Sequence, residues 1–239
     1  MKGRSSSTKM TRTDGSSTGK SKPLRIAVMG AAAVGKTCIV NRFMNDTFIE
    51  KHEATVEDFH QKQYKISKND VQMMEIVDTT GSYQFPAMMR LSMTISHAFI
   101  LVFSLDDRKS FEEVNRLRQE ILEERRNKPT YIVIVANKSD VPESEREVCS
   151  ITADIIATVE WGCDVYIETT AKHDVNITAL FSDITKKHYL RENDQSDSTD
   201  SHRTDARGER RKSVPLTFIN YKSNANLRKS KANTSCTIS

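Results

Sequence analysis

The sequence predicts an α/β domain whose mostly parallel sheet is covered by helices on both faces. Short apolar runs recur between residues 23 and 190 and alternate with segments of helical periodicity, which is the pattern of parallel strands joined by helices. The runs "AFILVFSL" (98–105) and "YIVIVA" (131–136) are apolar at nearly every position, as in strands buried on both faces. Ligands of such sheets bind beyond the carboxyl ends of the strands, so a functional site is expected there.

Length and composition suit one domain with a tail at each end. The chain has 239 residues, of which 37% are hydrophobic, enough for the core of a domain of ordinary size. We expect that domain at residues 23–190, because both flanks are polar and lack periodicity. Residues 1–22 are then a disordered basic arm and residues 191–239 a disordered tail, in which "VPLTFINY" (214–221) is an apolar island without an assigned role.

Cysteines, apolar runs and charge argue against several other classes of protein. The four cysteines have neither paired nor metal-type spacing, which favours a reducing compartment and mostly buried thiols. No apolar run approaches the roughly 20 residues that span a bilayer. Residues 221–239 carry four Lys or Arg and no acid, which equals the net charge of +4. The basic charge is thus local to the tail rather than spread over a folded face, so no nucleic-acid partner is expected.

The first half of the domain is predicted as a strand, a helix and a pair of strands. The apolar run 24–29 ends at Gly30, as a buried strand would, and residues 36–44 have helical spacing. Residues 59–66 and 71–77 are predicted as strands on either side of the turn "SKND" (67–70).

The second half continues the alternation of strand and helix. Between the two continuous apolar runs, residues 110–126 form a predicted amphipathic helix. Residues 164–168 and 176–190 are a last strand and a last helix. The apolar stripe of the helix at 110–126 consists of Phe111, Val114, Leu117, Ile121 and Leu122.

The segment "GAAAVGKT" (30–37) fits the phosphate-binding pattern G-x-x-x-x-G-K-[ST] between a predicted strand and a predicted helix. Successive backbone N–H groups and the helix N-terminus in such a loop surround phosphate oxygens. Lys36 would reach the β- and γ-phosphates, and the Thr37 hydroxyl would ligate Mg²⁺. The alternative, a chance glycine-rich turn, does not account for the flanking strand and helix.

The segment "NKSD" (137–140) follows the apolar run at 131–136. A carboxylate such as that of Asp140 accepts two parallel hydrogen bonds from guanine N1–H and the 2-amino group, a donor pair that adenine lacks. Taken alone, the segment is better explained as a polar turn that caps a helix. Its position after a phosphate loop favours the guanine site.

Five segments in this order, "GAAAVGKT", "ATVED", "DTTG", "NKSD" and "ETTAK", resemble the small GTPases of the Ras superfamily, Ras branch, over about residues 24–190. The fragments "FPAMMRLS" and "FILVFSLDDRKSFEEVNRLRQEIL" are most similar to the Dexras/Rhes-like subgroup. The resemblance implies the three-layer α/β/α G domain of P-loop NTPases, with a mostly parallel six-stranded sheet. It also implies GTP or GDP with Mg²⁺ as the bound cofactors.

The resemblance implies a role for each matching residue. Thr37, Thr55 and Asp78 would hold Mg²⁺, and Lys36, Thr55, Gly81 and Ser82 would act in hydrolysis. Phe48 matches the aromatic residue beside the base, although a core position explains that side chain equally well. The nucleotide-binding residues implied are Gly30, Ala31, Ala32, Ala33, Val34, Gly35, Lys36, Thr37, Cys38, Phe48, Thr55, Asp78, Gly81, Asn137, Lys138, Asp140, Thr170, Ala171 and Lys172.

Two segments resemble the family's partner surfaces, its effector segment and its second switch. In the second, "SYQFPAMMRLSM" (82–93), Pro86 is expected to fix a bend, and about half of Tyr83, Phe85, Met88 and Met89 are expected to pack inward. Effectors, exchange factors and activating factors are the partners implied, with a monomeric chain. An acidic solvated turn is the alternative for the effector segment, which consists of His52, Glu53, Ala54, Thr55, Val56, Glu57, Asp58, Phe59 and His60.

Departures from the family pattern predict slow GTP hydrolysis. Ser82 stands where a glutamine orients the attacking water in Ras, and its shorter hydroxyl cannot span the same gap. Ala32 and Ala33 replace glycines, so a Cβ projects toward the space of the water and of an incoming arginine. The alternative is a constitutively GTP-loaded scaffold with negligible hydrolysis. A small-metabolite kinase is disfavoured, because "NKSD" would have no purpose in it.

The chain ends in "CTIS" (236–239), a C-a-a-X sequence of the farnesyl type at Cys236. One lipid chain binds a membrane only marginally, and Lys or Arg residues beside it add at most about 1 kcal/mol each at an anionic leaflet. The lipid and the tail's basic residues together predict attachment to the cytoplasmic face of the plasma membrane, with room for a cytosolic pool.

Overall fold

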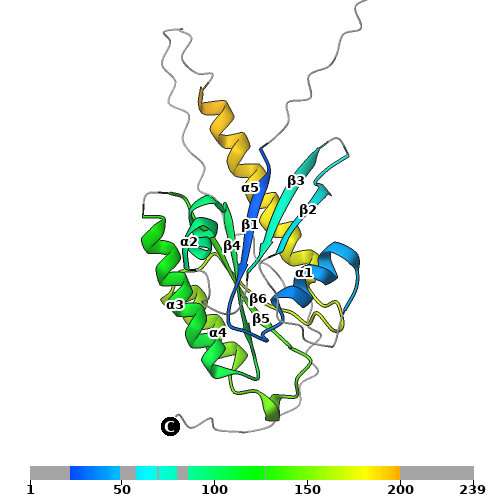
Figure 1. The fold of residues 1–239 in the computed structure, drawn as a ribbon, viewed down its shortest axis with the longest axis vertical. Coiled ribbons are helices and arrows are strands. Elements are labelled where there is room, and N and C mark those ends of the chain that lie inside the picture. Colours follow the sequence, from blue (N-terminus) through cyan, green and yellow to red (C-terminus); the bar gives the residue numbers. More distant parts are fainter. Residues whose placement is uncertain (1–21, 49–57, 69, 80–85, 127, 200–239) are drawn as a thin grey trace, which may run out of the picture. The chain divides into compact units, whose positions relative to one another are not determined.

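A six-stranded sheet forms the centre of the described part of the chain (Figure 1). The computed structural model describes residues 22–48, 58–68, 70–79, 86–126 and 128–199. The strands are β1 (Leu24–Met29), β2 (Asp58–Lys65), β3 (Val71–Asp78), β4 (Ala98–Ser104), β5 (Tyr131–Asn137) and β6 (Val165–Glu168).

The strand order is β2-β3-β1-β4-β5-β6. Only the β2–β3 pair among these strands is antiparallel, and its register places Asp58 opposite Asp78. The parallel pairs include β1 with β3 and with β4, so these strands share one carboxyl edge. The predicted mostly parallel α/β sheet is confirmed, and the strand pair predicted at 59–66 and 71–77 is its antiparallel edge.

Five helices flank this sheet in the described residues, and two of them were not predicted. They are α1 (Lys36–Asn45), α2 (Pro86–Ile95), α3 (Arg108–Glu124), α4 (Ser150–Ile155), which continues as a π-helical turn over Ile156–Glu160, and α5 (Ile177–Thr199). Pro86 begins α2 rather than bending a loop, because a proline fits the first helical position, where no N–H is needed. α4 was missed because it is short.

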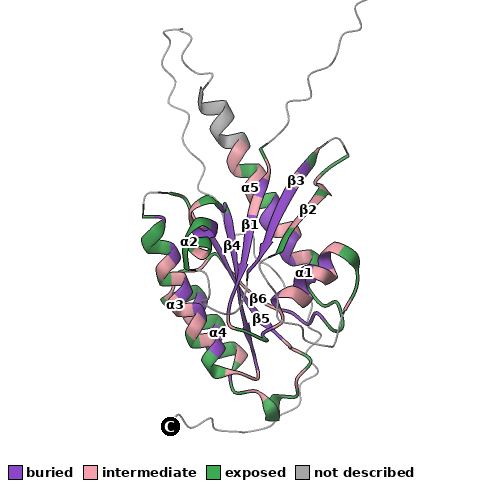
Figure 2. Ribbon diagram, viewed as in Figure 1, coloured by how far each residue is buried: buried purple, intermediate pink, exposed green. Residues whose placement is uncertain are grey.

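Each face of the sheet has its own core (Figure 2). Alternate residues of β1 point to opposite faces, with Ile26 and Val28 on one and Ala27 and Met29 on the other. The first face packs on α1 and α5, and the second on α2, α3 and α4. Strands β4 and β5 are buried at every position, as their continuous apolar runs predicted.

The last helix is longer than predicted. α5 continues to Thr199, nine residues past the predicted domain end at 190. Apolar residues stop there, but residues 191–199 contain neither proline nor glycine, so nothing in them breaks helical hydrogen bonding. The predicted disorder of the tail is therefore wrong for residues 191–199. Among the described helices, none is long and apolar enough to cross a membrane.

Two predictions about burial are also wrong. Leu122 is 40% exposed, because it lies about 100° around the helix from Ile121 and so turns off the buried stripe. No described cysteine is fully buried: Cys38 and Cys163 are half-buried and Cys149 is exposed. Cys149 is exposed and lies immediately before α4.

Candidate nucleotide-binding site

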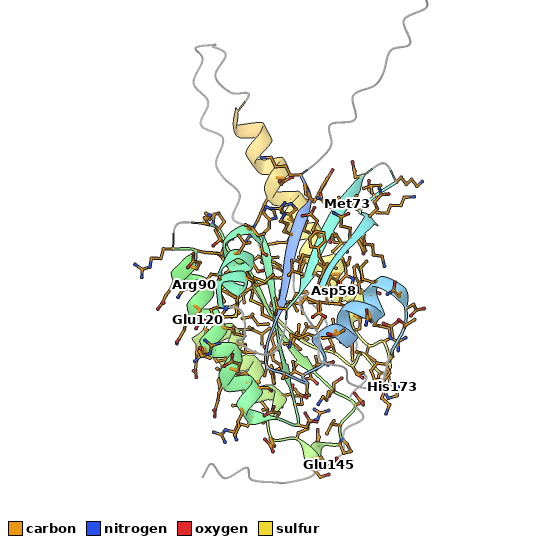
Figure 3. All side chains as sticks on the ribbon, viewed as in Figure 1. Asp58, Met73, Arg90, Glu120, Glu145 and His173 are labelled. Carbon is orange, nitrogen blue, oxygen red and sulfur yellow. The ribbon has the colours of Figure 1, made fainter. Side chains whose placement is uncertain are left out.

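The predicted nucleotide residues that the structure describes gather at the carboxyl edge of the sheet. Gly30 follows β1, Asp78 ends β3, Asn137 ends β5 and Thr170 follows β6. Figure 3 labels Asp58, at the start of β2, and His173, in the turn after β6, at two borders of this region. Residues far apart in sequence meet here because parallel strands end at one edge.

The loop between β1 and α1 requires its two glycines for steric reasons. Gly30 has φ +146°, and a Cβ on it would lie 2.1 Å from the Val102 carbonyl oxygen. Gly35 has φ +94°, and a Cβ there would lie 2.3 Å from Asn137 Nδ2. Side chains rarely adopt such φ values. The two glycines therefore let the loop lie directly against β4 and the "NKSD" segment.

The Lys36 side chain folds back over this loop. Its Nζ donates hydrogen bonds to the carbonyl oxygens of Gly30 (3.1 Å) and Ala31 (2.7 Å), and the residue is only 6% exposed. Burial lowers the pKa of Lys36 to about 8, although the nearby Asp78 carboxylate opposes the shift. A buried ammonium that no carboxylate of the described residues contacts directly is well suited to an anionic ligand.

Thr37 and Asp78 form the candidate metal centre. The Thr37 hydroxyl donates to Asp78 Oδ2 at 2.6 Å. Asp78 is completely buried, and its Oδ1 has no hydrogen-bond partner among the described residues. Burial raises the pKa of Asp78, against the Thr37 hydrogen bond and the charge of Lys36. A buried carboxylate oxygen that lacks a donor is satisfied by a cation, so these residues fit Mg²⁺.

The protein supplies only part of a magnesium coordination shell here. The described residues contain no cluster of three or more His, Cys, Asp or Glu able to hold a metal. Mg²⁺ commonly takes one or two protein ligands and completes its octahedron with waters and substrate phosphates. The pair Thr37 and Asp78 beside a phosphate loop matches that mode of binding.

Asn137 connects the two halves of the candidate site. Its Nδ2 donates to the Val34 carbonyl of the phosphate loop at 2.8 Å, and its Oδ1 accepts from the Thr169 hydroxyl at 3.1 Å. Asn137 is 3% exposed, so this linkage is buried. The asparagine therefore holds the phosphate loop, the "NKSD" segment and the end of β6 in one arrangement.

The two charged residues of "NKSD" face solvent more than Asn137 does. Lys138 has φ +61° and its Nζ lies 3.2 Å from an Asp106 carboxylate oxygen. Asp140 is exposed, and no hydrogen bond to its carboxylate is found among the described residues. A carboxylate presented in this way is available to a ligand with paired donors.

The "ETTAK" segment makes a closed turn after β6. Thr170 and Val175 form a backbone bridge, with N–H to carbonyl distances of 3.4 and 3.1 Å. Asn176 Nδ2 donates to the Glu168 carbonyl at 2.7 Å. Ala171 is 3% exposed while Lys172 is exposed. The turn therefore presents a short stretch of backbone beside the end of α1.

Structure adds several residues that sequence patterns did not indicate. Arg42 donates to the carbonyls of Ala171 and Lys172, and its guanidinium lies 5.9 Å from the Phe48 ring centroid. Arg146 donates to the carbonyls of Ser139 and Val141. Neither arginine belongs to one of the five motifs, so no sequence signal pointed to them. Phe48 itself is half-buried and also packs on the core.

The described part of the effector segment starts the edge strand β2. Asp58 lies 3.7 Å from His60 Nε2, and Phe59 is 54% exposed. Exposed apolar side chains also lie along α2, at Met88, Leu91 and Ile95, whereas Met89 packs on the core. The predicted division of this second segment into inward and outward residues therefore holds for the two methionines.

Several predicted site residues lie outside the described residues. This applies to the phosphate-sensing and hydrolytic positions, to most of the effector segment and to the lipidation site. They are His52, Glu53, Ala54, Thr55, Val56, Glu57, Gly81, Ser82 and Cys236, together with Tyr83 and Phe85. Predictions that depend on them stay predictions.

Comparison with known proteins defines the class to which this site belongs. Residues 25–190 match the model of the Ras family. The GTP-binding protein Rhes of Mus musculus is 42% identical over 165 residues, covering 66% of this chain and 61% of Rhes. The GTP-binding protein drn-1 of Caenorhabditis elegans is 42% identical over 67% of this chain and 73% of drn-1. The GTP-binding protein Di-Ras2 of Pongo abelii is 41% identical over 69% of this chain and 81% of Di-Ras2.

Together, the structure and these relatives define the class of this protein. It has a Ras-type α/β fold with a candidate phosphate loop at the carboxyl edge of the sheet. The chain belongs to the Ras family. The resemblance to the family and to its Rhes-like members is thereby confirmed. The similarity spans less than two thirds of the length of Rhes.

Proposed function

We propose that this chain binds GTP and GDP with Mg²⁺ and acts as a nucleotide-dependent signalling switch. The observation that carries the proposal is the buried linkage through Asn137, which joins the phosphate loop at Val34 to the end of β6 at Thr169. This linkage holds a phosphate cradle and a candidate base pocket at fixed separation. A nucleotide is the ligand class that needs both.

The chain's own residues would share the work of binding. Lys36 would exchange its bonds to the Gly30 and Ala31 carbonyls for bonds to anionic phosphate oxygens, which would raise its pKa again. Thr37 and Asp78 would hold Mg²⁺, which when bound neutralises phosphate charge. Asp140 would accept the guanine donors, and the Ala171 N–H would donate to the guanine carbonyl. Thr55 and Gly81 would sense the γ-phosphate and order both switch segments.

The nucleotide that copurifies with the chain tests this proposal. Denatured wild-type protein should release guanine nucleotide in about equimolar amount, and Asp140→Ala should release little. Asp154→Ala, an exposed position on α4, is the matched control and should behave as wild type. Release of adenine nucleotide, or of none by wild-type protein that binds no added GDP, would refute the proposal.

Effector, exchange-factor and activating-factor contacts are proposed for β2 and α2. β2 is an edge strand of the sheet, so its outer backbone groups can pair with a partner strand. Exposed Phe59 on β2, and Met88 and Leu91 on α2, supply apolar area on these two elements. A partner that binds through this surface should prefer GTP-loaded over GDP-loaded chain and lose affinity in Phe59→Ser. Equal binding to both nucleotide states would contradict the switch.

We further propose that intrinsic GTP hydrolysis is slow, because Ser82 replaces the water-orienting glutamine and Ala32 narrows the space beside it. Single-turnover hydrolysis of bound GTP measures this step. Ser82→Gln should accelerate it, and an unchanged rate in that variant would contradict the assignment. A wild-type rate that is negligible even with cell extract would favour the alternative, a constitutively GTP-loaded scaffold.

Attachment to the cytoplasmic face of the plasma membrane through prenylated Cys236 and the basic tail completes the proposal. Cys236→Ser should move the full chain from the membrane to the soluble fraction. Cys149→Ser is the control for loss of an exposed cysteine within the domain. Membrane fractionation of Cys236→Ser at the wild-type level would exclude lipid anchoring at this residue.

A further inference from the structure

Arg42 links the end of α1 to the turn after β6, and both segments lie beside the candidate base pocket. Its Nε donates to the Ala171 carbonyl at 3.0 Å, and its Nη2 to the Lys172 carbonyl at 3.2 Å. Its Nη1 donates to the Asp46 carbonyl at 3.1 Å, just past the end of α1. The guanidinium also lies over the Phe48 ring. One side chain thus contacts Phe48, Ala171 and Lys172, all predicted to surround the base.

The guanidinium binds the tip of the turn, which the hydrogen bonds within the turn do not hold. The Thr170–Val175 bridge and the Asn176 side chain join the two ends of the turn. Arg42 instead reaches its tip, at the two carbonyls that follow the Ala171 N–H. The arginine side chain is 14% exposed, so its hydrogen bonds are largely shielded from competing water.

Only an arginine can make this set of contacts. The planar guanidinium carries donors on three nitrogens in fixed directions, whereas a lysine amine is one point donor on a flexible stem. The three carbonyls lie on two separate segments, so they need donors that point in different directions within one plane, as those of a guanidinium do. Lysine would keep the charge but satisfy only one or two of them. The geometry therefore distinguishes a positioning role from a merely electrostatic one.

We propose that Arg42 is a positioning residue that sets the Ala171 N–H for the guanine carbonyl oxygen. The inference rests on the proposed guanine-nucleotide function and adds a determinant of base specificity. By fixing the two peptides after Ala171, Arg42 orders the donor before the base arrives, so binding loses less conformational freedom. It also joins that donor to α1, the helix that begins at Lys36 and Thr37.

Base analogues separate this role from general stability. GDP carries the carbonyl oxygen, the N1–H and the 2-amino group of guanine, 2-aminopurine riboside diphosphate lacks both the oxygen and the N1–H, and inosine diphosphate lacks only the amino group. Wild-type protein should prefer GDP over the 2-aminopurine analogue by more than about fivefold, the factor of one good hydrogen bond, because the analogue loses both the bond from the Ala171 N–H and the N1–H bond to Asp140. In Arg42→Ala this ratio should fall by about the factor of one hydrogen bond but stay above one, because the N1–H bond to Asp140 remains, with Arg42→Lys between. The preference for GDP over inosine diphosphate, which reports Asp140, should persist.

Arg118→Lys is the matched control, because Arg118 also donates to a backbone carbonyl, that of Trp161, but from α3. It should keep both wild-type ratios. A full preference for GDP over the 2-aminopurine analogue in Arg42→Ala would overturn the inference while leaving the proposed function intact. Absence of that preference in wild type, with no binding of GDP, would instead overturn the proposed function. Loss of both ratios together in Arg42→Ala would mean a general structural role and would also overturn the inference.

Discussion

At the candidate site, individual charged side chains are buried in a way that destabilises the ligand-free fold and favours a bound ligand. Lys36 is buried against two carbonyls, and the Asp78 carboxylate has an oxygen without a partner in the described chain. Both groups have pKa values shifted toward their neutral forms, chiefly by burial. Such groups lower the stability of the fold and are compensated when opposite charge arrives.

The Lys36 amine predicts a specific pH dependence of stability. Its pKa falls from 10.5 to about 8 on folding, so between these values the unfolded chain binds more protons and stability rises with pH. Relative to Lys36→Met, the free energy of unfolding of nucleotide-free wild type should increase by about 3 kcal/mol across this window. Urea unfolding at several pH values measures it.

Lys109→Met, at an exposed position of α3, controls for the loss of a surface lysine in that comparison. If the free energies of unfolding of wild type and Lys36→Met changed equally with pH, Lys36 would not be buried as described. Nucleotide affinity should collapse in Lys36→Met but not in Lys109→Met.

At the scale of the elements, Arg125 anchors the carboxyl end of α2. Its Nη1 donates to the carbonyls of Met93 (3.2 Å), Thr94 (3.2 Å) and Ser96 (2.5 Å). Its Nη2 donates to the Pro129 carbonyl at 3.2 Å. The residue is 7% exposed. A fixed carboxyl end would leave the amino-terminal end of α2, which belongs to the second switch segment, as the freer end of the helix.

Arg125→Met should therefore destabilise the fold by about 3 kcal/mol, because it leaves several buried carbonyls without donors. Hydrogen exchange of residues 86–96 should rise more than that of β4 and β5. Arg116→Met is the matched control, since Arg116 pairs with Glu113 and Glu120 on the half-exposed surface of α3 and should cost under about 1 kcal/mol. Equal losses in the two variants would contradict the anchoring role.

At the scale of the whole domain, ligand binding and folding are linked. A ligand present at about 100 times its dissociation constant adds about 2.7 kcal/mol to the stability of a protein that binds it only when folded. GDP with Mg²⁺ should raise the unfolding midpoint of wild type accordingly. Asp78→Asn should lose the part that depends on Mg²⁺, because it removes the buried carboxylate that we propose binds the metal.

Thermal unfolding with GDP, in Mg²⁺ and then in a chelator, measures this linkage. Asp154→Asn, an exposed change on α4, should keep the full Mg²⁺ effect. An Asp78→Asn protein that responds to Mg²⁺ as wild type does would remove Asp78 from the metal centre.

Much of the architecture could be predicted from the chain's pattern. The two failures arose where a helix does not carry a buried apolar stripe. β4 and β5 were predicted because strands buried on both faces are apolar throughout. α4 and the π-helical turn after it could not be predicted, since their apolar residues Ile151, Ile155 and Val159 are exposed. Within them only Ala153 and Ala157 reach the core. The end of α5 was misplaced because helical hydrogen bonds continue without apolar side chains.

The amino-acid sequence by itself determined the fold class, the Ras family and the order of the nucleotide motifs, because glycine spacing and apolar runs are local properties of the chain. Only the tertiary structure decided which other residues support those motifs. Arg42 and Arg146 lie outside the five motifs and act through backbone carbonyls. A carbonyl has no residue identity, so a contact with it leaves no signature in the sequence and is visible only once the chain is folded.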